Sequence, residues 1–181
     1  MILFRSHYQE ENFQRDFEFA LQNLFYLAEE APAFLCIGTD KHLLDTFGPL
    51  LGTMLQDKIP SLTVIGTLEQ PVHAKNLVSF MDRIQAVNQE QEIIAIDAAI
   101  GPREDIGMIQ LRKGPLSPGK AMSRHLPAVG DYSLTAVLDV KIHSRMSAAR
   151  KDNNLGLAAV YKMASLLSEA TAACYGSCNQ P

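Results

Sequence analysis

The chain has 181 residues, of which 47% are hydrophobic and 20% charged, a balance typical of a folded globular domain whose core needs no disulfides or metal ions. Its formal net charge of -4 argues against a nucleic-acid-binding protein that relies on a basic surface. No apolar run approaches the roughly 20 residues of a membrane span, and the N-terminus lacks the pattern of a signal peptide. Together with an odd number of cysteines, these features lead us to expect a cytoplasmic protein with no membrane or nucleic-acid partner.

Along most of the chain, apolar residues recur with the spacing of helices and strands in alternation. An amphipathic helix is predicted over residues 12–30, because Phe13, Phe17, Leu21 and Leu24 recur three and four residues apart. Short apolar runs bounded by Gly, Pro and polar residues predict strands. These strands are expected at 34–38, 62–66, 92–98, 107–112 and 132–142, with helices at 46–58, 72–88 and 121–126. A helix over about 153–173 and a mobile tail at 174–181 close the pattern.

The alternation of strands and helices through a core region at residues 34–142 predicts the fold class. Parallel strands are joined by crossover connections, and the helices in these connections cover the faces of the sheet. The first three expected strands are continuously apolar, whereas the strands at 107–112 and 132–142 are sparser and suit antiparallel edge positions. We therefore expect a single three-layer α/β/α domain over residues 1–181, with a mostly parallel or mixed sheet.

Two aspartates follow apolar strands, at positions where α/β proteins place their chemistry. Asp97 ends the expected strand at 92–98, and Asp45 lies in the loop after the strand at 34–38. In a parallel sheet, both carboxylates would lie at the carboxyl edge, where a ligand crevice forms between oppositely directed crossovers. Such a pair can hold one proton, activate water and polarise a carbonyl. The same oxygens together with a histidine could instead hold a divalent metal.

Each aspartate also has a purely structural interpretation. Asp45 precedes a predicted helix, and aspartate is among the best helix-capping residues, a task that Thr46 could share. Asp97 could begin a loop and form a local turn through its side chain. The residue pattern alone leaves both interpretations open.

Five stretches of the sequence resemble the spore germination proteases and the smaller sporulation proteins related to them. The stretch at 36–52 reads CIGTDKHLLDTFGPLLG and resembles their strand–loop–helix motif, and the stretch at 93–102 reads IIAIDAAIGP and resembles their second signature. GPLSPGKAM at 114–122 and HLPAVGD at 125–131 are similar to their glycine-rich region. GTLEQPVHAKNL at 66–77 resembles the small spore-protease-like family of the YyaC type. The resemblance covers roughly residues 34–140.

The resemblance implies a role for both aspartates. The two functional aspartates of the germination protease lie in motifs that match DTFGP and AIDA, which correspond to Asp45 and Asp97. The sequence is more distantly similar to the hydrogenase-maturation endopeptidases, which share a phosphorylase/hydrolase-like fold. Those enzymes hold a metal with carboxylates at the same two places and a histidine further on. By that resemblance, a metal would be held by Asp45, Asp97 and His125.

Five further residues are secondary candidates for the site. His73 and Asn76 follow the second strand and would face the same crevice if that strand neighbours the first; surface or capping roles are the alternative. Thr39 and Asp40 lie on the first loop, whose backbone N–H groups could polarise a carbonyl, or they are solvated loop residues. Gly119 is a turn former, and the family resemblance places its loop beside the site.

These observations lead to three functional hypotheses. The first is a sporulation-associated endopeptidase of the germination-protease type, in which Asp45 and Asp97 hydrolyse a peptide bond without a cofactor. The resemblance implies a protein or peptide substrate such as a small acid-soluble spore protein, in the cytoplasm of the forespore or mother cell of a sporulating host. The second is a metal-dependent maturation-type endopeptidase with a divalent metal. The third is a catalytically silent module that binds a peptide or protein in the crevice at the carboxyl edge of the sheet. An oligomer is compatible with all three.

Overall fold

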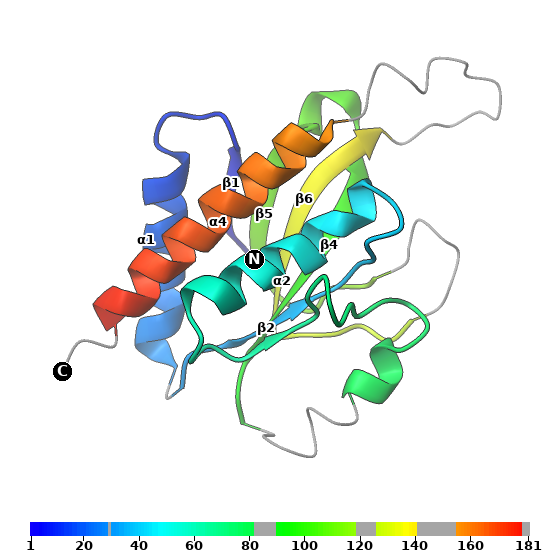
Figure 1. Cartoon of the computed structure of the whole chain (residues 1–181). Helices are drawn as coiled ribbons and strands as arrows, with labels where there is room; N and C mark the ends of the chain where they lie inside the picture. The colour runs from blue at the N-terminus through cyan, green and yellow to red at the C-terminus, as the bar shows by residue number, and fades with distance from the viewer. Residues whose placement is uncertain (29, 82–89, 119–125, 141–154, 179–181) are drawn as a thin grey trace, which may run out of the picture.

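A six-stranded mixed β-sheet forms the centre of the structure, a computed structural model that describes residues 1–28, 30–81, 90–118, 126–140 and 155–178 (Figure 1). Its strands are β1 (Ile2–His7), β2 (Ala33–Cys36), β3 (Val64–Ile65), β4 (Ile93–Gly101), β5 (Met108–Lys113) and β6 (Tyr132–Val140). The spatial order is β1-β5-β6-β4-β2-β3. Neighbours from β6 through β4 and β2 to β3 are parallel, whereas β5 pairs antiparallel with β6 and β1. The expected mixed sheet is confirmed. The edge positions expected for the strands at 107–112 and 132–142 are wrong, because β5 lies between β1 and β6, and β6 lies between β5 and β4.

Helices and connecting segments cover both faces of this sheet, which gives the predicted three-layer α/β/α arrangement. On one face lie α1 (Phe13–Leu27), α2 (Phe47–Lys58) and α4 (Leu157–Cys178), as Figure 1 shows. Their apolar residues form one core with the sheet side chains of that face, among them Phe34, Ile96 and Leu134. On the other face, a segment with helical residues 77–81 packs against β2 and β4. None of the helices in the described part of the chain is long and apolar enough to cross a lipid bilayer.

Strand β1 was not predicted from the sequence. Only Phe4 of β1 is buried, so the strand shows no clean alternation that would identify it. It is an edge strand that pairs with β5, about a hundred residues away along the chain. The ring of Phe4 packs edge-on against Phe13 and Phe17 at centroid distances of 5.4 and 5.2 Å, which attaches the strand to α1.

Several element boundaries differ from those expected. Strand β4 continues to Gly101, past the predicted end at residue 98, because it stays paired with β6. The helix expected from residue 72 begins at Leu77, since Val72 instead forms a β-bridge with Ile37. The rest of that helix, from residue 82, lies outside the described residues, as do residues 121–125 of the short helix expected at 121–126.

The C-terminal tail expected at residues 174–181 is wrong for its first five residues. Helix α4 runs to Cys178, and the side chain of Cys174 is fully buried in the core that α4 shares with α1 and α2. The turn-forming composition of the last residues was outweighed by this packing. Residues 179–181 lie outside the described residues.

Helix α2 packs against the ends of β2 and β3 with no side chain in between. A Cβ atom at Gly48 would collide with the carbonyl oxygen of Ile37, and one at Gly52 would collide with the carbonyl oxygen of Gly66. The two glycines are four residues apart and so lie on the same side of the helix. This backbone contact sets the distance between the start of α2 and the end of β2.

We predict that Gly48→Ala lowers the free energy of unfolding by about 1–3 kcal/mol, because the added methyl group overpacks a backbone contact. Helix propensity alone would favour Ala by about 1 kcal/mol, so a loss of stability reports the contact directly. Urea denaturation measures the effect. Gly176→Ala in α4 is the matched control, since nothing lies within 4 Å of its Cβ position. A Gly48→Ala protein as stable as this control would contradict the prediction.

Candidate active site

The strand order places a topological switch point between β2 and β4. From β2 the chain passes through α2 to β3 on one side of β2, and from β3 it crosses the opposite face of the sheet to reach β4 on the other side. In open α/β sheets, a crevice forms outside the carboxyl ends of the strands at such a point. The loops that follow β2 and β3, together with the second half of β4, border this place.

Asp97 projects from β4 beside the carboxyl end of β2. The last residue of β2, Cys36, pairs with Ile96, so Asp97 is the first residue of β4 beyond that ladder. The Ile37 N–H still donates to the Ile96 carbonyl at 2.8 Å. The expectation that Asp97 ends its own strand is wrong, because β4 continues along β6 and pairs Asp97 with Thr135. Asp97 lies on β4 next to the end of β2, beside the switch point.

Asp45 lies in η1 (Leu44–Thr46), a short 3-10 turn that leads into α2. The turn contacts β4, the strand that carries Asp97. The N–H of Thr39 donates to the Asp45 carbonyl at 3.0 Å, which fixes the turn to the end of β2. No side chain caps either η1 or α2, so the capping role considered for Asp45 and Thr46 is not observed.

The environment of Asp97 favours its protonated form. Burial raises the pKa of the Asp97 carboxyl from its usual 3.8 to about 7, opposed by a hydrogen bond from the Ala98 backbone and reinforced by the charge of Asp45. Burial is the largest of these causes, so Asp97 differs from an exposed carboxylate even without its neighbour. The charge of Asp45 thus reaches the carboxyl of Asp97 and adds to the rise of its pKa. Asp97 is held as an acid near neutral pH.

His73 and Asn76 lie on a segment that borders the same edge of the sheet. Val72 bridges to Ile37, and its carbonyl accepts from the Gly38 N–H at 2.7 Å. The Asn76 side chain closes the local turn: its Oδ1 accepts from the His73 N–H at 2.8 Å, and its Nδ2 donates to the Pro71 carbonyl at 3.0 Å. These bonds give Asn76 a structural task. His73 is half-buried, and its Nδ1 accepts from the Lys75 N–H at 3.3 Å.

The remaining candidates contribute less to the geometry. The Thr39 hydroxyl donates to Oδ1 of the exposed Asp40 at 3.4 Å, a contact within the loop itself. Gly119 and His125 lie outside the described residues. Two threonines beside the aspartates were not among the predicted site residues. Thr135 pairs with Asp97 across β6 and β4, and the hydroxyl of Thr46, the residue after Asp45, bonds within the loop. Only strand pairing and loop geometry reveal them.

The metal site that the resemblance implies needs two carboxylates and a histidine. Asp45 and Asp97 supply two carboxylates. Within the ranges that the structure describes, no group of three or more His, Cys, Asp or Glu side chains is placed to hold a metal ion. The third implied ligand, His125, is not among the described residues. The described residues therefore supply two of the three implied ligands, and no chemical step is assigned to a metal.

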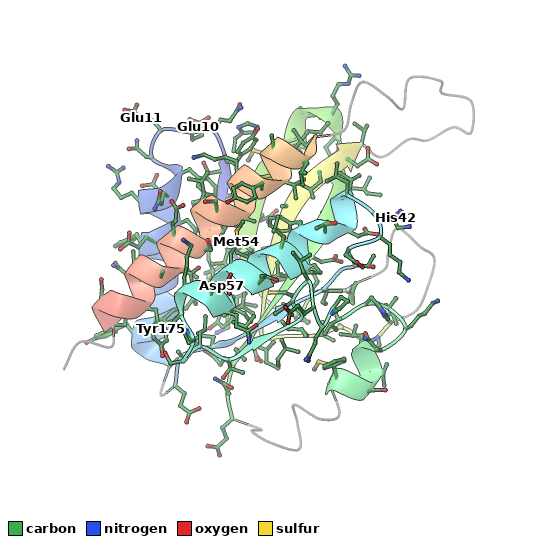
Figure 2. The ribbon with its side chains drawn as sticks, in the orientation of Figure 1. Glu10, Glu11, His42, Met54, Asp57 and Tyr175 are labelled. Atoms are coloured by element: carbon green, nitrogen blue, oxygen red, sulfur yellow. The ribbon has the colours of Figure 1, made fainter. Side chains whose placement is uncertain are left out.

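We predict that Asp97→Asn stabilises the protein increasingly as pH rises. A carboxyl with a raised pKa in the folded state adds no penalty at about pH 4, where it is protonated, and its full penalty above about pH 7, where it ionises. The gain of the variant over wild type should therefore grow by about 2–4 kcal/mol between about pH 4 and pH 8. Urea denaturation across this range measures it. Asp57→Asn, an exposed aspartate of α2 labelled in Figure 2, is the control and should show little change. Parallel pH curves for both variants would refute the burial of Asp97.

Comparison with known proteins identifies the family. Residues 5–170 match the family described as "Protein of unknown function (DUF1256)". The chain is 35% identical over 136 residues to the uncharacterized protein YyaC of Bacillus subtilis (strain 168), and the alignment covers 75% of this chain. It spans 65% of the length of that relative. The match over most of its length shows that the chain belongs to the DUF1256 family and is a YyaC-type protein.

Proposed function

We propose that this protein is an endopeptidase that hydrolyses a peptide bond with Asp45 and Asp97. The observation that carries the proposal is the placement of two electrostatically coupled carboxyls at the switch point of the sheet, with the pKa of Asp97 raised to about 7. Perturbed carboxyls with unlike environments are a frequent feature of acid–base sites.

The different environments of the two aspartates suggest different roles. Asp45, exposed in η1, is the carboxylate that accepts a proton from water as the water oxygen attacks the peptide carbonyl carbon. Asp97, half-buried and protonated, donates a hydrogen bond to the carbonyl oxygen and stabilises the charge that develops there. When the C–N bond breaks, the departing amine takes the proton that Asp45 received. Both carboxyls then return to their starting states.

The substrate class of the proposal comes from the motif resemblance. The stretches at 36–52 and 93–102, which carry the two aspartates, resemble motifs of the spore germination proteases. We therefore propose a small acid-soluble spore protein or a similar protein as the substrate, in the cytoplasm of a sporulating cell. The metal-dependent endopeptidase and the silent binding module are retained as outcomes that the experiment below separates.

The decisive experiment is incubation of the purified protein with small acid-soluble spore protein, followed by intact mass spectrometry. Wild type should yield discrete fragments, with or without a chelator. Asp45→Asn and Asp97→Asn should each reduce the cleavage rate by at least about a hundredfold, because each removes one partner of the acid–base pair. Asp57→Asn on the outer side of α2 should cleave as wild type does (Figure 2).

The other outcomes each favour a different hypothesis. Loss of fragments with chelator and their return with added divalent metal would favour the metal-dependent endopeptidase. Binding of the substrate with no fragments from any sample would favour the silent module. Fragments that persist in both Asn variants would contradict the aspartate pair and indicate a contaminating protease.

The proposal also fixes the direction of the pH dependence. Catalysis needs protonated Asp97, so the cleavage rate should be sustained below about pH 7 and fall as pH rises through the pKa of Asp97. Initial cleavage rates across this pH range, with the fold followed by circular dichroism, measure the profile. A rate that rises steadily above about pH 7 would be inconsistent with Asp97 as the acid.

A further inference from the structure

The hydroxyl of Thr46 does not cap helix α2, although Thr46 directly precedes that helix. A threonine directly before a helix usually caps it by accepting a hydrogen bond from the first-turn backbone. Here Thr46 is already helical, with φ -72° and ψ -19°, and forms no such bond. Its Oγ1 instead lies 3.0 Å from the His42 carbonyl and 3.4 Å from the Thr39 carbonyl.

Of these two contacts, the longer one links Thr46 to the start of the loop, and the shorter one stays within the turn. The one hydroxyl proton is shared between the two carbonyls. Its shorter arm goes to the His42 carbonyl, which also accepts from the Thr46 backbone N–H at 3.1 Å, and its longer arm goes to the Thr39 carbonyl. The contact with Thr39 joins residues on opposite ends of the loop. It also complements the bond from the Thr39 N–H to the Asp45 carbonyl at 3.0 Å. Thr39 is thus held at its N–H and at its carbonyl by two consecutive residues, and we call this pair of bonds the Thr39 latch.

The Thr39 latch fixes the backbone of Asp45 to the end of β2. The adjoining residue, Gly38, has no room for a side chain, because a Cβ there would collide with the Asp45 carbonyl oxygen. One residue earlier, the Ile37 N–H bonds to the Ile96 carbonyl, directly before Asp97. The two aspartates are therefore connected through a short stretch of backbone with one hydrogen bond at each end.

We propose that Thr46 is a positioning residue that holds Asp45 opposite Asp97 through the Thr39 latch. This inference rests on the proposed aspartate pair, but it does not require that the pair cleave a particular substrate. Removal of the hydroxyl leaves the bond from the Thr39 N–H to the Asp45 carbonyl as the remaining half of the Thr39 latch, and Asp45 then shifts relative to Asp97.

The test compares Thr46→Val, which keeps the shape and removes the hydroxyl, with Thr46→Ser, which keeps the hydroxyl. In Thr46→Val, the pKa of Asp97, followed by carboxyl ¹³C NMR, should fall toward the value measured in Asp45→Asn, because the charge of Asp45 raises it in wild type. The kcat for spore-protein cleavage should fall about tenfold to a hundredfold with little change in KM. Thr46→Ser should recover most of both effects, and urea denaturation checks that both variants are folded.

The two readouts separate this inference from the proposed function. A wild-type titration of Asp97 in folded Thr46→Val would overturn the positioning role, whether or not cleavage is lost. A shifted titration that Thr46→Ser restores would support it even if no sample cleaves the spore protein. In that case the proposed substrate or reaction fails, and the positioning role stands.

Discussion

The contact on which the site depends is the one between the backbone of α2 and the backbone at the ends of β2 and β3. Gly48 and Gly52 allow the helix to approach until carbonyl oxygens of Ile37 and Gly66 occupy the space of absent side chains. Any larger residue would lift the helix and, with it, the turn that carries Asp45. Because interiors are packed as tightly as crystals, such a shift cannot be absorbed locally. The glycines therefore act on the site without belonging to it.

Burial and charge act together on Asp97, but they do not act equally. Loss of hydration is the larger cause of its raised pKa, and the neighbouring charge of Asp45 is the smaller. The pair is therefore asymmetric: burial raises the pKa of Asp97, whereas the side chain of Asp45 is exposed. A symmetric pair that shares one proton equally would need similar surroundings for both carboxyls. The different roles proposed for them follow from this difference in depth.

The polar groups around the loops are used mainly to define their shape. The side-chain oxygen and nitrogen of Asn76 both form hydrogen bonds within one turn. The hydroxyl of Thr53 in α2 accepts from the Leu68 N–H at 2.9 Å and so holds the loop after β3. Cys36 is fully buried beneath this region, and burial raises the pKa of its thiol, which stays neutral and packs as a small apolar group. Such a rigid surround suits a site whose two acidic groups must keep a fixed relation.

The sequence by itself determined the alternation of strands and helices and the mixed sheet, and it singled out Asp45 and Asp97 as candidates. Each of these rests on local hydrophobic periodicity or on a short motif. The sequence missed β1, whose position depends on pairing with β5 about a hundred residues away, and it ended α4 too early because the burial of Cys174 is a tertiary contact. Local rules also left helix capping open as a role for Asp45 and Thr46, whereas the structure directs the Thr46 hydroxyl to the His42 and Thr39 carbonyls. Only the tertiary structure decided the depth of Asp97 and its distance from bulk water. Hydration and cross-strand neighbours are properties of the assembled sheet, and no window of sequence contains them.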